Sequence, residues 1–294
     1  MATLGDHIYL GCILIASAIW WTIQASKRYN FSRQRQQEFF TSVTFPCCAA
    51  LQKYPVEAVV KIIAGFLGIL SQLRVGDEHS RRAHMDSLNL GKARFLPVYL
   101  AIVISGVTDA LVKWYPRQIL SKLNWILLAM VYVLLMLLFW NPAGSLDDVL
   151  FVLGQLEGFL AGFCCFVVIM EARFSRSIGF CLLRGYFTLV MGSWMCHIGL
   201  LSSDDTQNQY PTSDTNIFST PLNELEGHTR IILVTLYFTW HCGIGMLLQL
   251  IIWIITMRLA QENQCLCPVQ EAKTTDGVCL ENRVYLEEID ILGH

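Results

Sequence analysis

Seven long apolar stretches constrain the fold of this chain more than any other feature. Each is long enough for a helix to cross roughly 30 Å of hydrocarbon. Because a bilayer core offers no hydrogen-bond partner to the backbone, each stretch is expected to be helical. The sequence therefore predicts an all-α, polytopic membrane protein, a bundle of seven transmembrane helices. The predicted spans are about 7–25, 57–73, 95–112, 123–140, 149–170, 178–201 and 231–257.

Composition supports this fold class. Of the 294 residues, 54% are hydrophobic and 15% are charged, whereas soluble domains carry about 25% charged residues. The net charge of −2 gives no indication of a nucleic-acid partner. The first span lacks the basic start and the cleavage site of a signal peptide, so it is predicted to be retained. We expect one transmembrane domain, residues 1–258, followed by a polar, disordered tail, residues 259–294.

The Lys and Arg residues between the spans predict the orientation. Three linkers carry several of them, namely 26–56, 113–122 and 171–177, and two carry none, namely 141–148 and 202–229. This distribution predicts an outside N-terminus and a cytosolic tail, although the basic linker 74–94 argues for the reverse. We expect the protein in the plasma membrane or in secretory or endosomal membranes.

The eleven cysteines do not predict a disulfide framework. Six lie within predicted spans, where a thiol usually packs as a small apolar group. The others lie on the predicted cytosolic side, where thiols stay reduced. Cys265 and Cys267 follow the last span closely, so S-acylation and two unmodified thiols are both open. The sequon Asn30–Phe31–Ser32 is expected to stay bare because it faces the cytosol.

Two short features concern packing. Gly158 and Gly162 form a GxxxG pair, which lets helices approach closely and which we assign to packing within the chain. The apolar piece "EFFTSVTFPCCAAL", residues 38–51, is too short to span and is predicted to lie at the membrane interface.

One set of ionisable residues falls near the predicted cytosolic ends of the helices. It consists of Glu57, Lys61, Asp109, Glu171 and Arg184. A charge inside a span costs roughly 2.5 kcal/mol or more at mid-bilayer, so each needs a partner or an aqueous cavity. Glu57 and Lys61 are four residues apart and share a helix face, and Arg184 can reach Glu171 or Asp109. We interpret the set as an ion-pair network that fixes helix register; a polar vestibule is the alternative.

A second polar set lies deeper and towards the predicted outside. It consists of Glu157, His7, His197 and His241, accompanied by Trp194 and Trp240. A carboxylate and a neutral imidazole can share a proton or coordinate a cation. The histidine spacings of known zinc sites are missing, so no metal or cofactor is predicted. Interhelical hydrogen bonding, with His241 near Trp194, is the favoured interpretation.

Several motifs occur in order along nearly the whole chain. They are "GDHIYLGCILIASAIWW", Glu57, "YLAIVISGVTDAL" with Gly106 and Asp109, Glu171 followed by "LLR" ending at Arg184, "GSWMCHIG" and "FTWHCG". In this order they resemble the transmembrane protein 45 and transmembrane epididymal protein family. The resemblance places His7, Trp194 and His241 at family-typical positions. It implies the architecture rather than an activity, because the family has no settled biochemical activity.

Two segments depart from the pattern of that family. Its Trp-x-His or Trp-His-His segment is replaced here by "KARF", Lys92–Phe95, and its His-x-His pair by "WNPAG", Trp140–Gly144. The chain therefore resembles a divergent member, of the epididymal type, and histidine-rich metal chemistry is not carried over.

Three functions follow from these observations. We favour a non-enzymatic membrane protein that acts through the lipid bilayer or through protein partners bound by its tail. The first alternative is a transporter or channel for protons, ions or small solutes that uses Glu157 and His241. The second is an intramembrane metal-dependent lipid hydrolase, which needs at least three converging ligands and an activated water.

Overall fold

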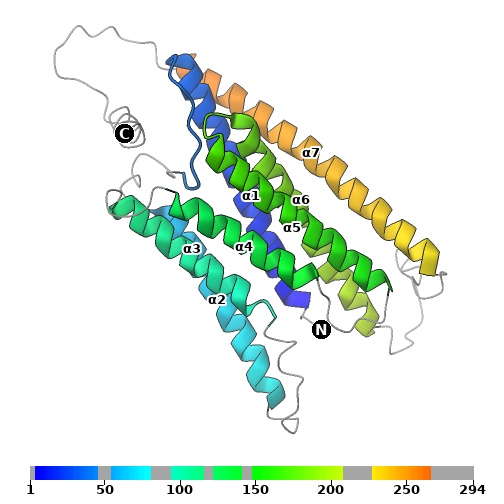
Figure 1. Ribbon diagram of the computed structural model, residues 1–294. Coiled ribbons are helices and arrows are strands. Elements are labelled where there is room, and N and C mark those ends of the chain that lie inside the picture. Colours follow the sequence, from blue (N-terminus) through cyan, green and yellow to red (C-terminus); the bar gives the residue numbers. More distant parts are fainter. Residues whose placement is uncertain are drawn as a thin grey trace, which may run out of the picture.

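A computed structural model describes residues 4–45, 54–80, 94–115, 122–140, 148–207 and 227–265 of the chain. Within these residues there are seven helices and no strand (Figure 1). All seven helices are long and apolar enough to cross a membrane, which confirms the predicted fold class. They are α1 (Leu4–Gln34), α2 (Val56–Ser80), α3 (Leu96–Trp114), α4 (Leu123–Trp140), α5 (Asp148–Arg173), α6 (Ile178–Gln207) and α7 (Gly227–Cys265).

The helices match the apolar stretches but several extend beyond them. Helix α3 begins at Leu96, one residue after the predicted start, with Pro97 in its first turn, where proline is well tolerated. Helix α7 continues to Cys265, seven residues past the predicted end of the domain at 258, so the start of the predicted tail is helical. Cys267 and the rest of the tail lie outside the described residues.

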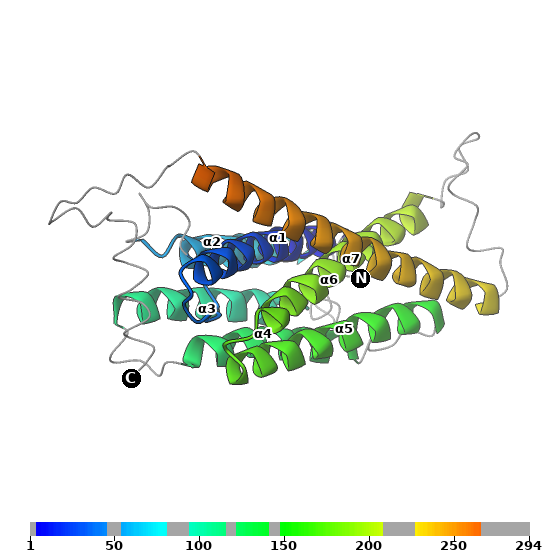
Figure 2. The same ribbon diagram turned by 90° about the horizontal axis from the view of Figure 1, so that it is seen from above.

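The helices do not pack in chain order. Helix α1 makes its most extensive contacts with α6, while α2 packs on α3 and α4 packs on α5. Helices α2 and α7 lie at opposite edges of the bundle (Figure 1). Seen at right angles, α7 crosses α6 on one side while α3, α4 and α5 form the other (Figure 2). Only 22% of the span of α2 and 17% of that of α7 is buried, so these two helices present the most surface to lipid.

Glycines allow the closest helix pairs to form. A Cβ atom added at Gly192 of α6 would lie 2.7 Å from the carbonyl oxygen of Gly11 on α1, so only glycine fits this crossing. A Cβ atom at Gly158 would meet α4 first, with the Trp140 nitrogen at 3.5 Å. Around Gly162 the nearest atom is the Met136 sulfur, also on α4. The GxxxG pair therefore packs within the chain.

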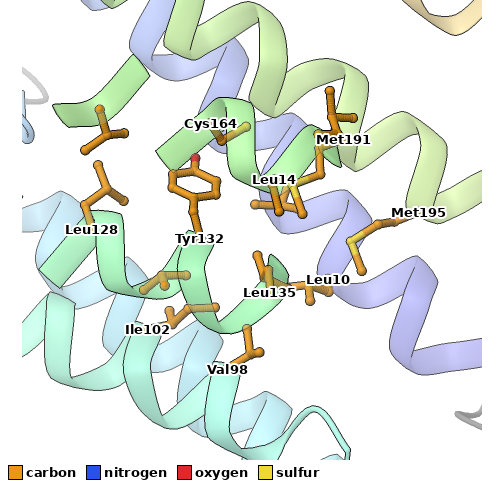
Figure 3. Close-up of a cluster of buried hydrophobic side chains, with 14 of the residues drawn as sticks. Leu10, Leu14, Val98, Ile102, Leu128, Tyr132, Leu135, Cys164, Met191 and Met195 are labelled. Atoms are coloured by element: carbon orange, nitrogen blue, oxygen red, sulfur yellow. The ribbon is translucent and has the colours of Figure 1, made fainter. Parts of the chain in front are cut away.

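The apolar core lies between α1, α3, α4, α5 and α6. Side chains such as Leu14, Leu135 and Met191 point towards one another from three of these helices (Figure 3). Cys164 is buried among them as a free thiol. Dispersion and close packing, rather than the hydrophobic effect, stabilise such contacts where lipid is the solvent.

Residues 37–45, which we call the strap, leave α1 and fold back against the ends of the helices (Figure 1). Phe39, Val43 and Phe45 of the strap are buried. The Thr41 backbone N–H donates a hydrogen bond to the Ser175 carbonyl between α5 and α6, at 2.8 Å. The strap is thus packed against the bundle through its side chains and backbone, and the location of the apolar piece 38–51 at the membrane interface stays a prediction, with residues 46–51 outside the described residues.

Candidate functional site

Glu57 connects three parts of the chain at the end of the bundle where α1 finishes, which we call the strap end. It lies in the first turn of α2, where the helix dipole favours a carboxylate. Its Oε1 accepts a hydrogen bond from the Trp21 indole at 2.8 Å, and its Oε2 accepts one from Trp20 at 3.2 Å. The backbone N–H of Phe45 also donates to Oε2, at 2.8 Å. One carboxylate therefore joins α1, α2 and the strap.

Lys61, one turn further along α2, lies between two carboxylates. Its Nζ is 2.6 Å from Oδ2 of Asp109 on α3 and 3.9 Å from Oε1 of Glu57. The Asp109 side chain is fully buried, and that of Lys61 is 14% exposed. The short contact with Asp109 joins α2 to α3. The longer contact, with Glu57, lies within α2 itself.

Arg184 of α6 and Glu171 of α5 form a second ion pair, with both side chains fully buried. Nη1 of Arg184 is 3.3 Å from Oε2 of Glu171, without hydrogen-bond geometry. The strap supplies the hydrogen bonds: Nη2 of Arg184 donates to the Ser42 carbonyl at 3.3 Å, and the Thr41 hydroxyl donates to Glu171. A buried pair needs such additional partners to offset its desolvation.

Trp21 links the two groups of charges. Its indole N–H binds Glu57, and the Arg184 guanidinium lies 4.6 Å from the centre of its ring, a cation–π contact. The structure thus brings together at the strap end all five residues of the first predicted set, which we call the charged layer: Glu57, Lys61, Asp109, Glu171 and Arg184. Each charge faces an opposite one, and the layer fixes four helices and the strap relative to α1.

His197 and His241 lie side by side between α6 and α7, with ring centres 5.2 Å apart. Trp194 packs on both, at 5.4 Å from each ring, and Tyr237 lies 5.4 Å from His197. We call these four residues the histidine cluster. His241 pairs through Nδ1 with the Ser193 hydroxyl, at 3.1 Å. The expected neighbour Trp194 therefore contacts His241 through its ring, and the hydrogen bond between α6 and α7 goes to Ser193.

Two other members of the second predicted set lie elsewhere. His7 packs edge-on against Phe95, with ring centres 5.1 Å apart, and also contacts the ring of Phe139. Trp240 is 62% exposed on α7 and so points away from the bundle. Neither residue joins the histidine cluster, because α1 and α7 each turn only one face towards α6.

Glu157 of α5 is fully buried, and neither of its carboxyl oxygens has a hydrogen-bond partner among the described residues. The neighbouring cation is Arg94, immediately before α3. Burial lowers the pKa of the Arg94 guanidinium from its usual value, and the nearby Glu157 carboxyl raises it. Arg94 donates to the Leu138 carbonyl and lies over the Phe139 ring at 5.6 Å.

Sequence reasoning did not single out Arg94 as a site residue. A basic residue directly before an apolar span is the usual pattern of an interfacial anchor, so its position gives no signal of an inward-turned side chain.

In the part of the chain that the structure describes, no three His, Cys, Asp or Glu side chains are grouped as metal ligands.

The chain matches no known protein-family model and no curated protein. The resemblance to the transmembrane protein 45 and transmembrane epididymal protein family therefore stays a prediction from the motifs.

Proposed function

We propose that this multi-pass membrane protein is not an enzyme and that it acts by binding a protein partner, with the helix bundle as a fixed frame. The observation that carries the proposal is the charged layer. A reactive group must be left available to a substrate, whereas each of these charges is held by an opposite charge, and most by hydrogen bonds as well. Removing Arg184, Glu171 or Lys61 would leave a buried charge without its counter-charge, which is the property of a structural network.

The partner is proposed to bind at the strap end, where α7 also finishes (Figure 1). We propose that this end faces the cytosol, since the linkers 26–56, 113–122 and 171–177 are basic. The surface here carries the exposed ion pair of Arg176 with Glu38 of the strap, at 3.1 Å. We propose that the acidic segment "VYLEEIDILGH", residues 284–294, supplies a short motif for recognition.

The test is proximity labelling in cells by a biotin ligase fused after the tail, or directly after Cys265 in a truncated chain. We expect truncation to remove a specific set of labelled cytosolic proteins, and His241→Ala with the tail intact to retain it. Equal labelling by all three chains would contradict a partner bound by the tail. Stoichiometric zinc in the purified wild type, lost in His241→Ala, would instead support the metal-dependent lipid hydrolase.

Glu157 favours a second candidate, a proton or ion pathway. An ionisable side chain inside a membrane bundle is often part of an ion or proton pathway, and Glu157 is fully buried with no hydrogen-bond partner among the described residues. This function predicts pH-dependent flux in proteoliposomes that Glu157→Gln abolishes. Glu171→Gln is unsuitable as a control because it breaks the charged layer, so the matched control is His197→Gln. Flux that is absent, or that persists in Glu157→Gln, would remove this candidate.

A further inference from the structure

A cavity of about 380 Å³ lies between α1, α2, α3 and α4. It occupies the side of the bundle where α1 contacts α2 far less than it contacts α6. Most of its wall is apolar, and Figure 3 shows part of it, with Ile102 of α3 beside Leu128 and Tyr132 of α4. An apolar cavity of about 300–1,000 Å³ with few polar groups is the usual form of a small-molecule site.

The cavity reaches the surface of the bundle along α2. Val60 lines it and is 59% exposed. Helix α2 is long and apolar enough to cross a membrane, so this surface faces acyl chains rather than water. A molecule would therefore enter from the bilayer.

Ser105 gives the cavity a polar group in need of a partner. It lines the cavity from α3 and is 2% exposed, and its hydroxyl has no hydrogen-bond partner among the described residues. Leaving a buried polar group unsatisfied costs about 1–3 kcal/mol, and a partner that completes its hydrogen bonding is one explanation for such a group. A polar group on a bound molecule would supply it.

Lys61 and Glu57 line the cavity too and leave further hydrogen-bonding capacity. The Lys61 ammonium has three donors, of which one is used in the described contacts, towards Asp109. The Glu57 carboxylate has about four lone-pair positions, and three are taken, by Trp20, Trp21 and the Phe45 backbone. A free donor and a free acceptor therefore stand near one another.

The charges around this polar end select the kind of head group. Glu57 and Asp109 are two carboxylates around one ammonium, that of Lys61, which leaves an excess of one negative charge in the ionised forms. An anionic head group would be repelled strongly where little water screens the charges. A cationic head group would lie beside the Lys61 ammonium in the cavity wall and would be repelled by it. A neutral hydroxyl matches the site because it both donates and accepts a hydrogen bond.

We propose that the cavity binds a neutral membrane lipid whose head group carries a hydroxyl. The apolar body lies between α1, α2, α3 and α4, and the hydroxyl group binds at Ser105, Lys61 and Glu57. This site goes beyond the proposed protein partner and does not depend on it, since the strap-end surface is not used.

The test uses the full chain in nanodiscs with three photoreactive, alkyne-tagged probes: a monoacylglycerol, a sterol and a fatty acid. We expect one or both hydroxyl lipids to label peptides from residues 13–21 and 56–64, in competition with the same lipid unlabelled. The two hydroxyl probes show which kind of body the cavity takes. The fatty acid, an anion at neutral pH, is expected to label at least about tenfold less. A monoacylglycerol with its hydroxyls methylated controls for the apolar body alone.

Ser17→Phe places a ring in the cavity from α1 and is expected to reduce labelling at least about tenfold. Its control is Thr239→Phe on the exposed surface of α7, where the Thr239 hydroxyl donates to the Thr235 carbonyl of the same helix. Ser105→Ala is expected to reduce labelling by the hydroxyl lipids about two- to tenfold and to leave labelling by the methylated probe unchanged.

Three results would overturn the proposal. They are preferential labelling by the fatty acid, equal labelling by the methylated and hydroxyl probes, and labelling that neither Ser17→Phe nor Ser105→Ala lowers. If Ser17→Phe does not fold, Ser105→Ala and the methylated probe decide the question. Loss of the proximity-labelled partners on tail truncation is a separate readout, so the two proposals fail independently.

Discussion

Two carboxylates on α5, Glu157 and Glu171, are buried to the same extent and have opposite surroundings. Both are fully buried. Glu171 meets the Arg184 guanidinium and accepts a hydrogen bond from Thr41 of the strap, whereas Glu157 has no hydrogen-bond partner among the described residues. The difference shows that burial of an acid inside a membrane bundle does not by itself define its role. The partners distinguish the two: Glu171 is tied to Arg184 and to the strap, whereas the charge nearest to Glu157 is that of Arg94 and no hydrogen bond joins them in the described residues.

The largest effect is expected from Arg184→Met. This change removes the cation from a fully buried pair and leaves Glu171 uncompensated, which typically costs about 3–5 kcal/mol. The free energy of unfolding in mixed micelles, measured by SDS titration, checks the value. The matched control is Arg176→Met, because Arg176 and its partner Glu38 are 69% and 60% exposed. An exposed pair contributes only about 0–1 kcal/mol, so similar losses in both variants would show that the charged layer is not structural.

Arg184→Met combined with Glu171→Leu sharpens the comparison. Replacing a whole buried pair by apolar side chains is often neutral or better, since no charge is left without a partner. We expect the double variant to recover at least about half of the loss seen in Arg184→Met. The recovery is incomplete because the Thr41 hydroxyl and the Ser42 carbonyl of the strap lose their partners. A double variant as unstable as the sum of the two single variants would contradict the pairing.

A smaller loss, about 1–2 kcal/mol, is expected from His241→Ala in the histidine cluster. The change removes the hydrogen bond to Ser193 and the ring contact with Trp194. The neighbouring Trp240→Ala is the control, because this side chain is 62% exposed and is expected to change stability by less. The same unfolding titration compares the two. A larger loss of stability in Trp240→Ala than in His241→Ala would contradict the assignment of His241 to the α6–α7 contact.

The smallest effect is expected from Glu157→Gln. Because no hydrogen bond of the Glu157 carboxyl is described, we expect the stability to be unchanged or slightly higher, within about 1 kcal/mol. The same chemical change at Glu171 leaves Arg184 unpaired and is expected to cost about 3–5 kcal/mol. Equal losses in Glu157→Gln and Glu171→Gln would erase the distinction between the two carboxylates and assign Glu157 to the frame, with Arg94 as its partner.

The sequence is sufficient to predict features that depend on neighbouring residues. Hydropathy over about 20 residues defines the seven spans, and the four-residue spacing places Glu57 beside Lys61. The sequence leaves open whether Arg184 meets Glu171 or Asp109, because the answer depends on which helices are neighbours. Helix α5 packs on α6, whereas α3 packs on α2 and α4, so Arg184 meets Glu171; the order of the apolar stretches does not reveal these neighbours.

The burial of the strap and the orientation of Arg94 could not be predicted from the sequence. A nine-residue apolar piece such as the strap has too little periodicity to show which side is buried, and the partners of Thr41 and Ser42 lie 130 and 142 residues away. The orientation of the Arg94 side chain depends on the Leu138 carbonyl and the Phe139 ring of α4. Neither contact leaves a local signal in the sequence.

The strap also sets the order in which the protein is assembled during synthesis. Its last residue, Phe45, binds Glu57 only 12 residues later, so this end attaches as soon as α2 enters the membrane. Thr41 binds Glu171 and Ser42 binds Arg184, which are made only after three and four more helices, respectively, have begun. Because chains are built from the N-terminus, the strap closes in two stages, and its second stage waits for α6. The segment that follows the first helix is thus fully attached only once the sixth helix has been made.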